Sequence, residues 1–213
     1  MELKGKKINF IGDSITYGVG PSSFEKTYHA LIAEREGIIA RNYGISASKI
    51  AKHVEPIYDI RDNMPFCLRV DEMDADADAV VVFGGTNDYG MGIPLYDADY
   101  TFDKYTFHGA LHILIRALLE RYPGKTIVFM TPLHRAGEKG IHGFLGKPLS
   151  EYVQMIRDVC EAYSIPVCDL YKNAGIYADD PKQRELYIPD GLHPNDAGHE
   201  IIASRLTAFL KSL

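Results

Sequence analysis

A serine, an aspartate and a histidine occur in two short segments near opposite ends of this sequence. The first segment is Gly12-Asp13-Ser14-Ile15-Thr16, and the second is Asp190-Gly191-Leu192-His193-Pro194. A serine hydroxyl is a weak nucleophile until a neighbouring base takes its proton, and an imidazole can be that base. Asp190 lies three residues before His193, close enough to accept the other ring N–H and to fix the histidine tautomer. We therefore expect Ser14, His193 and Asp190 to act together in acyl transfer, as nucleophile, base and the carboxylate that orients the base.

Acyl transfer also needs hydrogen-bond donors for the oxyanion that forms when the serine attacks. The backbone N–H of Ser14 is one candidate donor. The segment Asn42-Tyr43-Gly44 offers a second, because Gly44 has no side chain to block the approach to its N–H. The segment Gly84-Gly85-Thr86-Asn87-Asp88 offers a third in the side-chain amide of Asn87. These residues predict an oxyanion hole made by Ser14, Gly44 and Asn87.

Each motif also has an ordinary structural interpretation. Gly-Asp-Ser is a common turn, Asn87-Asp88 could close a strand as an Asx turn, and Asp190 with His193 could be a surface pair before a helix. We interpret Asp13 and Asp88 as residues that orient their neighbours. A glycosidase would need two carboxylates in opposed environments, and nothing singles out such a pair. The joint occurrence of these motifs favours the catalytic interpretation.

The elements that must position these residues follow from the pattern of apolar residues. Short β-branched runs predict five strands, at residues 7–12, 38–43, 79–84, 126–131 and 166–170. Longer segments with helical periodicity alternate with them, which is typical of a parallel sheet covered by helices on both faces. In such a sheet the ligand crevice lies at the carboxyl ends of the strands. The motifs follow strand ends or precede the last helix, so we expect them to converge there.

Two helices are predicted in detail. One carries a core-facing stripe made of Leu111, Leu114, Ile115, Leu118 and Leu119, and Pro123-Gly124 ends it. The last helix, at about 195–213, is expected to bury Ile202, Leu206 and Phe209. Three long connections remain, at 89–105, 133–147 and 171–193, and loops of this length often bind ligands.

Together, the motifs resemble the blocks of the SGNH or GDSL-type lipase/esterase family, in the same order and over nearly the whole chain. The resemblance implies a single domain over residues 1–213 with a flavodoxin-like, three-layer α/β/α fold and a five-stranded parallel sheet. It also implies nucleophile Ser14, oxyanion donors Ser14, Gly44 and Asn87, and the Asp190–His193 pair. The sequence departs from the family pattern at two places: Ile15 stands where a leucine is usual, and Ser46-Ala47 where Ser-Gly is common.

Segment 89–107 mixes tyrosines and phenylalanines with aspartates. Such a mixture suits a sugar ring better than a long acyl chain, which prefers an aliphatic trough. Tyr89, Tyr100 and Tyr105 are therefore candidate substrate-binding residues, with His134 from the next connection. We predict a serine esterase that cleaves short-chain esters, such as O-acetylated carbohydrates. An equal alternative is that these aromatic residues only anchor a long loop.

Composition narrows the classes of protein. The chain has 213 residues, of which 46% are hydrophobic and 24% charged, as expected for a globular domain. Its net charge of −6, without a lysine or arginine cluster, argues against a nucleic-acid partner. No apolar run approaches the roughly 18 residues of a membrane span, and no signal peptide is visible, so we expect a cytoplasmic protein. The three cysteines, Cys67, Cys160 and Cys168, lack CxxC spacing and suggest buried thiols.

Several alternatives stay open. A lysophospholipase or thioesterase would use the same residues, and a carbohydrate-, flavin- or nucleotide-binding domain could share the fold without turnover. Gly18-Val19-Gly20-Pro21 matches neither a P-loop nor the dinucleotide-binding motif, so the signal for phosphate binding is weak. Acyl transfer by serine needs neither a metal nor an organic cofactor, and we expect none. The expected partner is a small-molecule or carbohydrate ester, and the oligomeric state is left open.

Overall fold

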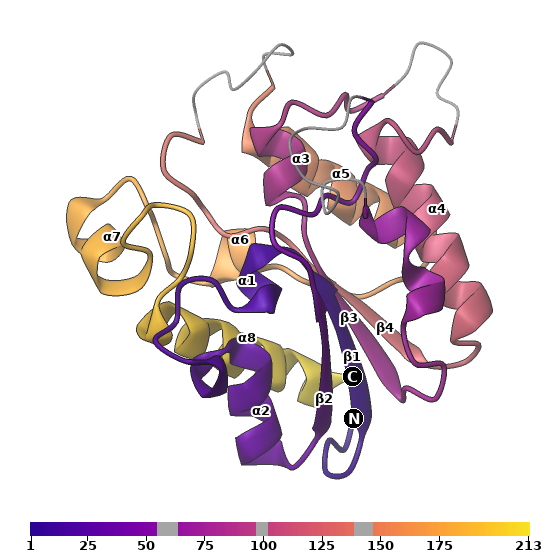
Figure 1. Ribbon diagram of the computed structural model, residues 1–213, viewed down its shortest axis with the longest axis horizontal. Helices are drawn as coiled ribbons and strands as arrows, with labels where there is room; N and C mark the ends of the chain where they lie inside the picture. The colour runs from indigo at the N-terminus through magenta and orange to yellow at the C-terminus, as the bar shows by residue number, and fades with distance from the viewer. Residues whose placement is uncertain (55–63, 97–101, 139–146) are drawn as a thin grey trace.

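The computed structural model describes residues 1–54, 64–96, 102–138 and 147–213 (Figure 1). Its sheet has five parallel strands in the order β2-β1-β3-β4-β5. They are β1 (Lys7–Gly12), β2 (Ile39–Gly44), β3 (Ala79–Phe83), β4 (Thr126–Met130) and β5 (Val167–Cys168). Helices cover both faces of the sheet, so the expected three-layer α/β/α fold is confirmed. The strand order is that of flavodoxin-like proteins.

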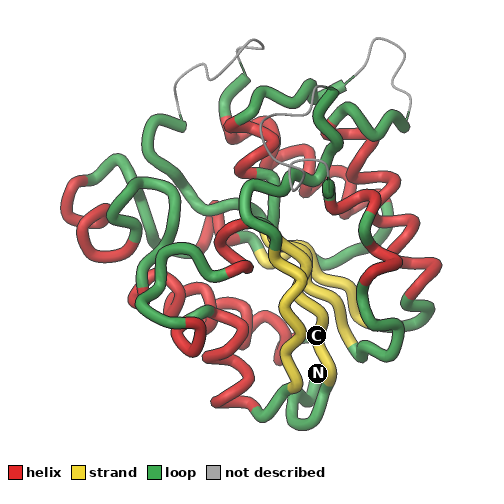
Figure 2. Tube along the Cα trace, in the orientation of Figure 1, coloured by secondary structure: helices red, strands yellow, loops and turns green. Residues whose placement is uncertain are grey.

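The helices divide into two groups, one on each face of the sheet (Figures 1 and 2). They are α1 (Ser14–Tyr17), α2 (Tyr28–Glu36), α3 (Thr86–Gly90), α4 (Phe107–Arg121), α5 (Leu149–Ala162), α6 (Leu170–Asn173), α7 (Pro181–Tyr187) and α8 (Asp196–Ser212), with short 3-10 turns at η1 (Phe24–Lys26), η3 (Phe66–Leu68) and η4 (Val70–Glu72). Helices α2 and α8 share one apolar core with the sheet, and α4 and α5 share the other. In the described part of the chain, no helix is both long enough and apolar enough to cross a bilayer.

The predicted strands agree with the structure to within one residue at each end, except the last. Strand β5 has only two residues, because Asp169 leaves the sheet to cap α6, where its side chain accepts the N–H of Lys172. The central strand β3 is buried along its whole length between β1 and β4. Its run of valines forms a strand because β-branched side chains pack well on a pleated surface covered on both sides.

The helix predictions were correct for most of the core positions and wrong for two. In α4 the first four residues of the expected stripe are fully buried, but Leu119 is 40% exposed. Position i+8 lies about 80° around a helix from position i, which takes Leu119 off the core-facing side. In α8, Ile202 and Leu206 are buried, whereas Phe209 is only partly buried and Leu210 occupies the core.

The long connection expected at 171–193 contains a helix that the sequence analysis did not predict. Helix α7 begins with Pro181, and the side chain of Asp180 accepts the N–H of Gln183. Asp-Pro is a good start for a helix, since proline suits the first turn and aspartate caps the free N–H groups. This helix shortens the true loop before His193 to a few residues.

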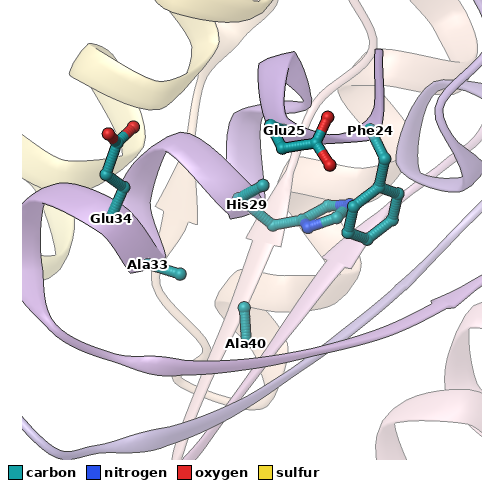
Figure 3. Close-up of a pocket in the computed structure, with 7 residues that line it drawn as sticks. Phe24, Glu25, His29, Ala33, Glu34 and Ala40 are labelled. Carbon is teal, nitrogen blue, oxygen red and sulfur yellow. The ribbon is translucent and has the colours of Figure 1, made fainter.

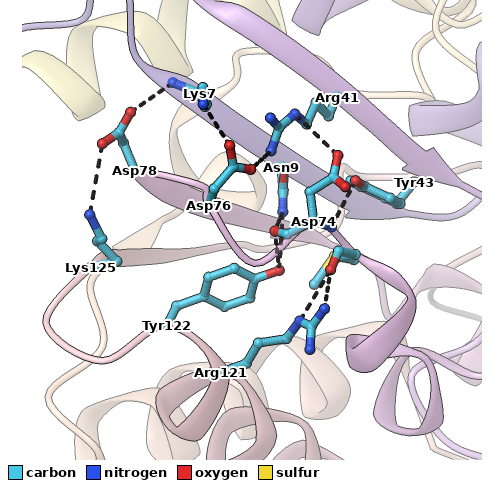
Figure 4. Close-up of polar contacts among 11 residues, drawn as sticks. Lys7, Asn9, Arg41, Tyr43, Asp74, Asp76, Asp78, Arg121, Tyr122 and Lys125 are labelled. Atoms are coloured by element: carbon cyan, nitrogen blue, oxygen red, sulfur yellow. Dashed lines mark hydrogen bonds and ion pairs between the residues drawn. The ribbon is translucent and has the colours of Figure 1, made fainter.

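A polar network joins the amino ends of the strands (Figure 4). Lys7 and Arg41 both contact the carboxylate of Asp76, at 2.5 and 2.6 Å. Beneath them, the buried Asn9 side chain donates to the carbonyl of Asp74 at 2.8 Å and contacts the Tyr122 hydroxyl at 3.1 Å. Since each strand runs away from this end toward its carboxyl end, the network fastens the sheet without contacting the motifs described above.

Candidate active site

The structure brings Ser14, His193 and Asp190 into one chain of hydrogen bonds. The Ser14 Oγ lies 3.0 Å from His193 Nε2, and His193 Nδ1 lies 2.6 Å from Asp190 Oδ2. Ser14 is the first residue of α1, two residues beyond the carboxyl end of β1, and the other two residues immediately precede α8. Residues from opposite ends of the chain thus meet with the spacing that proton transfer requires.

Asp190 is held as a carboxylate by its neighbours. Burial alone would raise its pKa, but the backbone N–H and ring of His193 and the backbone N–H of Leu192 bring the pKa below its usual value. Both backbone groups donate to Asp190 Oδ1, at 2.7 and 2.8 Å. A carboxylate accepts only, so His193 Nδ1 carries the proton toward Asp190. Nε2 is then the acceptor that faces Ser14.

The segment that carries His193 is fixed from two sides. On one side the Ala136 N–H donates to the carbonyl of Gly191 at 2.8 Å. On the other side lies Gly20, with a φ of +115°, so close that a side chain there would overlap the carbonyl of Pro194. Glycine is needed at this position both for its backbone conformation and for the close approach.

We expect Gly20→Ala to lower kcat/KM by about tenfold, because the added carbon would push the His193 segment away from Ser14. Gly124→Ala is a matched control: Gly124 also has a positive φ, of +72°, but only open space around it. Both variants place a side chain at a positive φ, but only Gly20→Ala adds an overlap beside His193, so only Gly20→Ala should lose ester turnover measured on its folded fraction. Equal activity in the two variants would contradict a positioning role for Gly20.

Asp13 and Asp88 lie beneath the site and hold the backbone segments around it. Asp13 Oδ1 accepts the N–H of Ile15 at 3.0 Å and so caps α1. The two oxygens of Asp88 accept the N–H groups of Ile50 and Ala51, at 3.0 and 2.9 Å, which ties α3 to the loop after β2. Burial raises the pKa of Asp13 to about 7 and the pKa of Asp88 to about 6, although these N–H donors act in the opposite direction.

The raised pKa of Asp13 predicts how stability should change with pH. Between its ordinary value of 3.8 and about 7, the folded state holds a proton on Asp13 that the unfolded state has lost. Asp13 therefore contributes a stability that is lost as pH rises through this window. Asp13→Asn keeps the oxygen that accepts the Ile15 N–H but cannot titrate.

We expect the free energy of unfolding of Asp13→Asn, measured relative to the parent, to increase by about 1.4 kcal/mol per pH unit between pH 4 and 7. Urea melts of both proteins at several pH values would measure this difference. A difference that stays constant with pH would show that Asp13 is ionised in the folded protein throughout.

The three expected oxyanion donors differ in their surroundings. The Ser14 N–H, at the start of α1, has no partner among the described residues. The Asn87 side chain donates one N–H to the carbonyl of Ser48 at 3.0 Å, which leaves its second N–H. The Gly44 N–H, which we expected to be available, donates instead to Asn42 Oδ1 at 2.7 Å.

The structure shows a packing reason for glycine at position 44, in addition to the expected role in the oxyanion hole. A side chain at Gly44 would overlap the backbone of Thr16 and Tyr17, so glycine is needed for α1 to pack against β2. A residue that the sequence analysis did not select lies three positions later. Ala47 has a φ of 65°, unusual for a residue with a side chain, and its N–H has no partner among the described residues. The sequence could have pointed to Ala47, because this residue lies in the loop after β2 at a position where glycine is common in the family that the chain resembles.

Three of the four expected substrate-binding residues are described, and their contacts lie away from Ser14. Tyr89 is 1% exposed and packs against Tyr152 in the core, so it presents no surface to a sugar. Tyr105 lies beside the amines of Lys52 and Lys104, and Tyr100 is outside the described residues. His134 contacts the buried Glu138 at 2.5 Å and stacks near Tyr171, with ring centroids 3.8 Å apart. None of these described contacts reaches Ser14 or His193.

Other aromatic residues form an exposed surface beside α1, the helix that begins with Ser14. A hollow of about 600 Å³ beside α1 is lined by Tyr17, Pro21, Ser23, Phe24, Asn42 and two glycines. The side chains of Tyr17 and Phe24 are 57% and 56% exposed. Phe24 also borders a second hollow of about 480 Å³ between α2 and β2 (Figure 3). At its inner wall His29 donates from Nε2 to the Thr16 carbonyl at 3.0 Å, which secures the last turn of α1.

Comparison with known proteins shows the family and the fold of this chain. The model of the GDSL-like lipase/acylhydrolase family matches residues 10–201. A crystal structure from Lactobacillus plantarum is 33% identical, with a TM-score of 0.85, covering 99% of this chain and 98% of its own. Another crystal structure is 34% identical, with a TM-score of 0.87 over 100% and 99% of the two chains. No curated protein sequence matches the chain.

The lipase/acylhydrolase of Enterococcus faecalis is a more distant neighbour. It is 22% identical, with a TM-score of 0.68, and the alignment covers 97% of this chain and 96% of that one. At this level of identity the likeness shows a shared fold.

Proposed function

This chain belongs to the GDSL-like lipase/acylhydrolase family, and from this premise we propose that it cleaves carboxylic esters through an acyl intermediate on Ser14. Membership in the family makes it a hydrolase of ester bonds. The observation that carries the assignment of residues is the chain of contacts at 3.0 and 2.6 Å from Ser14 through His193 to Asp190. Such a chain is what a serine nucleophile requires.

In the first half of the proposed reaction, His193 Nε2 takes the Ser14 proton as Oγ attacks the ester carbonyl. The carboxylate of Asp190 stabilises the resulting imidazolium and keeps the ring oriented. The imidazolium then gives its proton to the departing alcohol, which leaves the acyl group on Ser14. In the second half, His193 removes a proton from water, and the resulting attack releases the acid and restores Ser14.

We propose that the oxyanion of both halves binds to the backbone N–H of Ser14 and the side-chain amide of Asn87. Because the Gly44 N–H already has Asn42 as a partner, we assign the third donor to Ala47. Two features support this assignment. The Ala47 N–H has no partner among the described residues, and the carbonyl of the next residue, Ser48, is the group that Asn87 binds. Donors already fixed in place lower the barrier because they need no reorientation during the reaction.

For the substrate we propose a short-chain ester of a carbohydrate, such as an O-acetylated sugar. The hollow beside α1 supports this choice, since exposed rings of Tyr17 and Phe24 alternate there with the hydroxyl of Ser23 and the amide of Asn42. Aromatic faces stack on the apolar side of a sugar, and the polar groups can bind its hydroxyls. A lysophospholipase or thioesterase would need a continuous apolar trough, which this lining interrupts.

A panel of p-nitrophenyl esters of increasing chain length, assayed beside acetylated sugars, tests the proposal. We expect acetyl esters to give the highest kcat/KM and acetylated sugars to release acetate. Mass spectrometry after treatment with an organophosphonate should find the label on Ser14. Preference for long acyl chains would contradict the proposed substrate, and label on another serine would contradict the proposed nucleophile.

A further inference from the structure

Two histidines outside the active site face each other on the surface of α4. His108 and His112 are one helical turn apart, and their Nε2 atoms are 3.1 Å from one another. Both side chains are partly exposed, so the pair can be reached from solvent. Residues at i and i+4 lie on the same side of a helix, and the rigid backbone of a fifteen-residue helix holds them at this spacing.

The two rings are inclined to each other across a short contact. Their centroids are 4.5 Å apart and their planes are inclined at 68°. The two Nε2 atoms, 3.1 Å apart, are the ring nitrogens that face each other across this gap. Two imidazole nitrogens that bind one Zn²⁺ at about 2.0–2.1 Å are themselves roughly 3.0–3.4 Å apart.

The second ring nitrogen of His112, Nδ1, already has a hydrogen-bond partner of the kind that metal-ligating histidines usually have. The hydroxyl of Tyr163 lies 2.8 Å from His112 Nδ1, and Arg116 Nε donates to the same hydroxyl at 3.0 Å. A tyrosine oxygen can accept a second hydrogen bond, so His112 can carry its proton on Nδ1 and leave Nε2 as a ligand. Ligating histidines almost always donate their other ring N–H in this way.

We propose that His108 and His112 bind a divalent cation of the zinc class through their Nε2 atoms. Among the residues that the structure describes, no third histidine, cysteine, aspartate or glutamate joins the pair to form a group of three. Imidazole ligands favour Zn²⁺, Ni²⁺ or Cu²⁺ over Mg²⁺ and Ca²⁺, which prefer oxygen. The positive charge of Arg116 nearby opposes binding, and the site is consequently an exchangeable one rather than a permanent part of the fold.

Isothermal titration with Zn²⁺ on the full chain tests this site. We expect one Zn²⁺ ion to bind per protein molecule, and we expect that Mg²⁺ does not compete with Zn²⁺ for this site. His108→Ala and His112→Ala should each weaken binding by at least about tenfold, and Tyr163→Phe by about tenfold through the loss of the outer contact. Zn²⁺ should also raise the melting temperature of the parent and not of His112→Ala, because a ligand that binds only the folded state stabilises it.

Two control variants separate this site from other histidines. The His193→Ala variant should still bind one Zn²⁺ ion per molecule, since the proposed site is on α4 and away from the catalytic pair. His134→Ala, which removes a histidine held by Glu138, should bind it too. Loss of binding in His193→Ala with retention in both α4 variants would overturn the proposal, as would the lack of any zinc-dependent heat or stabilisation in the parent protein.

Discussion

Replacing Ser14 with alanine should lower kcat for a short-chain ester by about 10³-fold or more and leave the fold intact. The Ser14 hydroxyl supplies the bond-forming oxygen, and its one described side-chain contact is His193 Nε2. The side chain is 5% exposed and its neighbours tolerate the smaller methyl group, so no overlap arises. Initial rates with p-nitrophenyl acetate, together with a thermal melt of the same sample, would measure both quantities.

A matched serine gives the comparison. Ser150 is an exposed residue in α5, far along the chain from the site, and Ser150→Ala should keep the parental rate. If Ser14→Ala kept activity within tenfold of the parent, the serine mechanism would have to be abandoned. If it lost activity together with its cooperative melt, the change would have acted on the fold, and Ser14→Cys would then be needed to test the nucleophile.

Replacing Asn87 with alanine should lower kcat by roughly 10²–10³ with little change in KM. The amide hydrogen bond to the developing oxyanion strengthens in the transition state, so substrate binding should survive its loss. Asn87 also donates to the carbonyl of Ser48, and we therefore expect an additional loss of stability of about 1 kcal/mol. Steady-state kinetics and a melting curve on one preparation would give both effects.

The stability loss alone cannot account for a fall in kcat, and a second variant shows this. Thr106 caps α4 by accepting the N–H of Gly109, so Thr106→Ala should lose a similar stability, about 1 kcal/mol, without touching the site. Its kcat should stay at the parental value. Parental kcat in a stable Asn87→Ala protein would remove Asn87 from the oxyanion hole and leave it a structural residue of α3.

The strands and the catalytic segments could be predicted from sequence because they depend on local patterns. Val80-Val81-Val82 can hardly form anything but a buried strand, and Gly12-Asp13-Ser14 follows a strand end where a parallel sheet places its crevice. The distance between Ser14 and His193 could not be predicted. It depends on contacts such as Gly20 against Pro194, between residues far apart in the chain.

Two of the expected site residues have surroundings that the sequence did not show. Tyr89 belongs to a mixed aromatic and acidic segment that suggests a surface, but its own ring packs against Tyr152 and Arg135. Gly44 was interpreted through the oxyanion it could bind, whereas packing of α1 requires the glycine and Asn42 takes its N–H. A single sequence shows that a position needs a small residue or a polar one. It does not show which neighbour imposes the need.

His193 and Asp190 lie within one four-residue segment, and this arrangement divides the active site into two mechanical parts. His193 and the Asp190 carboxylate move together, because their contact at 2.6 Å lies within that segment. The 3.0 Å contact between Ser14 and His193 instead bridges two separately anchored bodies, β1 with α1 and the segment before α8. A displacement of the segment therefore changes the distance between Ser14 and His193 and leaves the pairing of His193 with Asp190 intact.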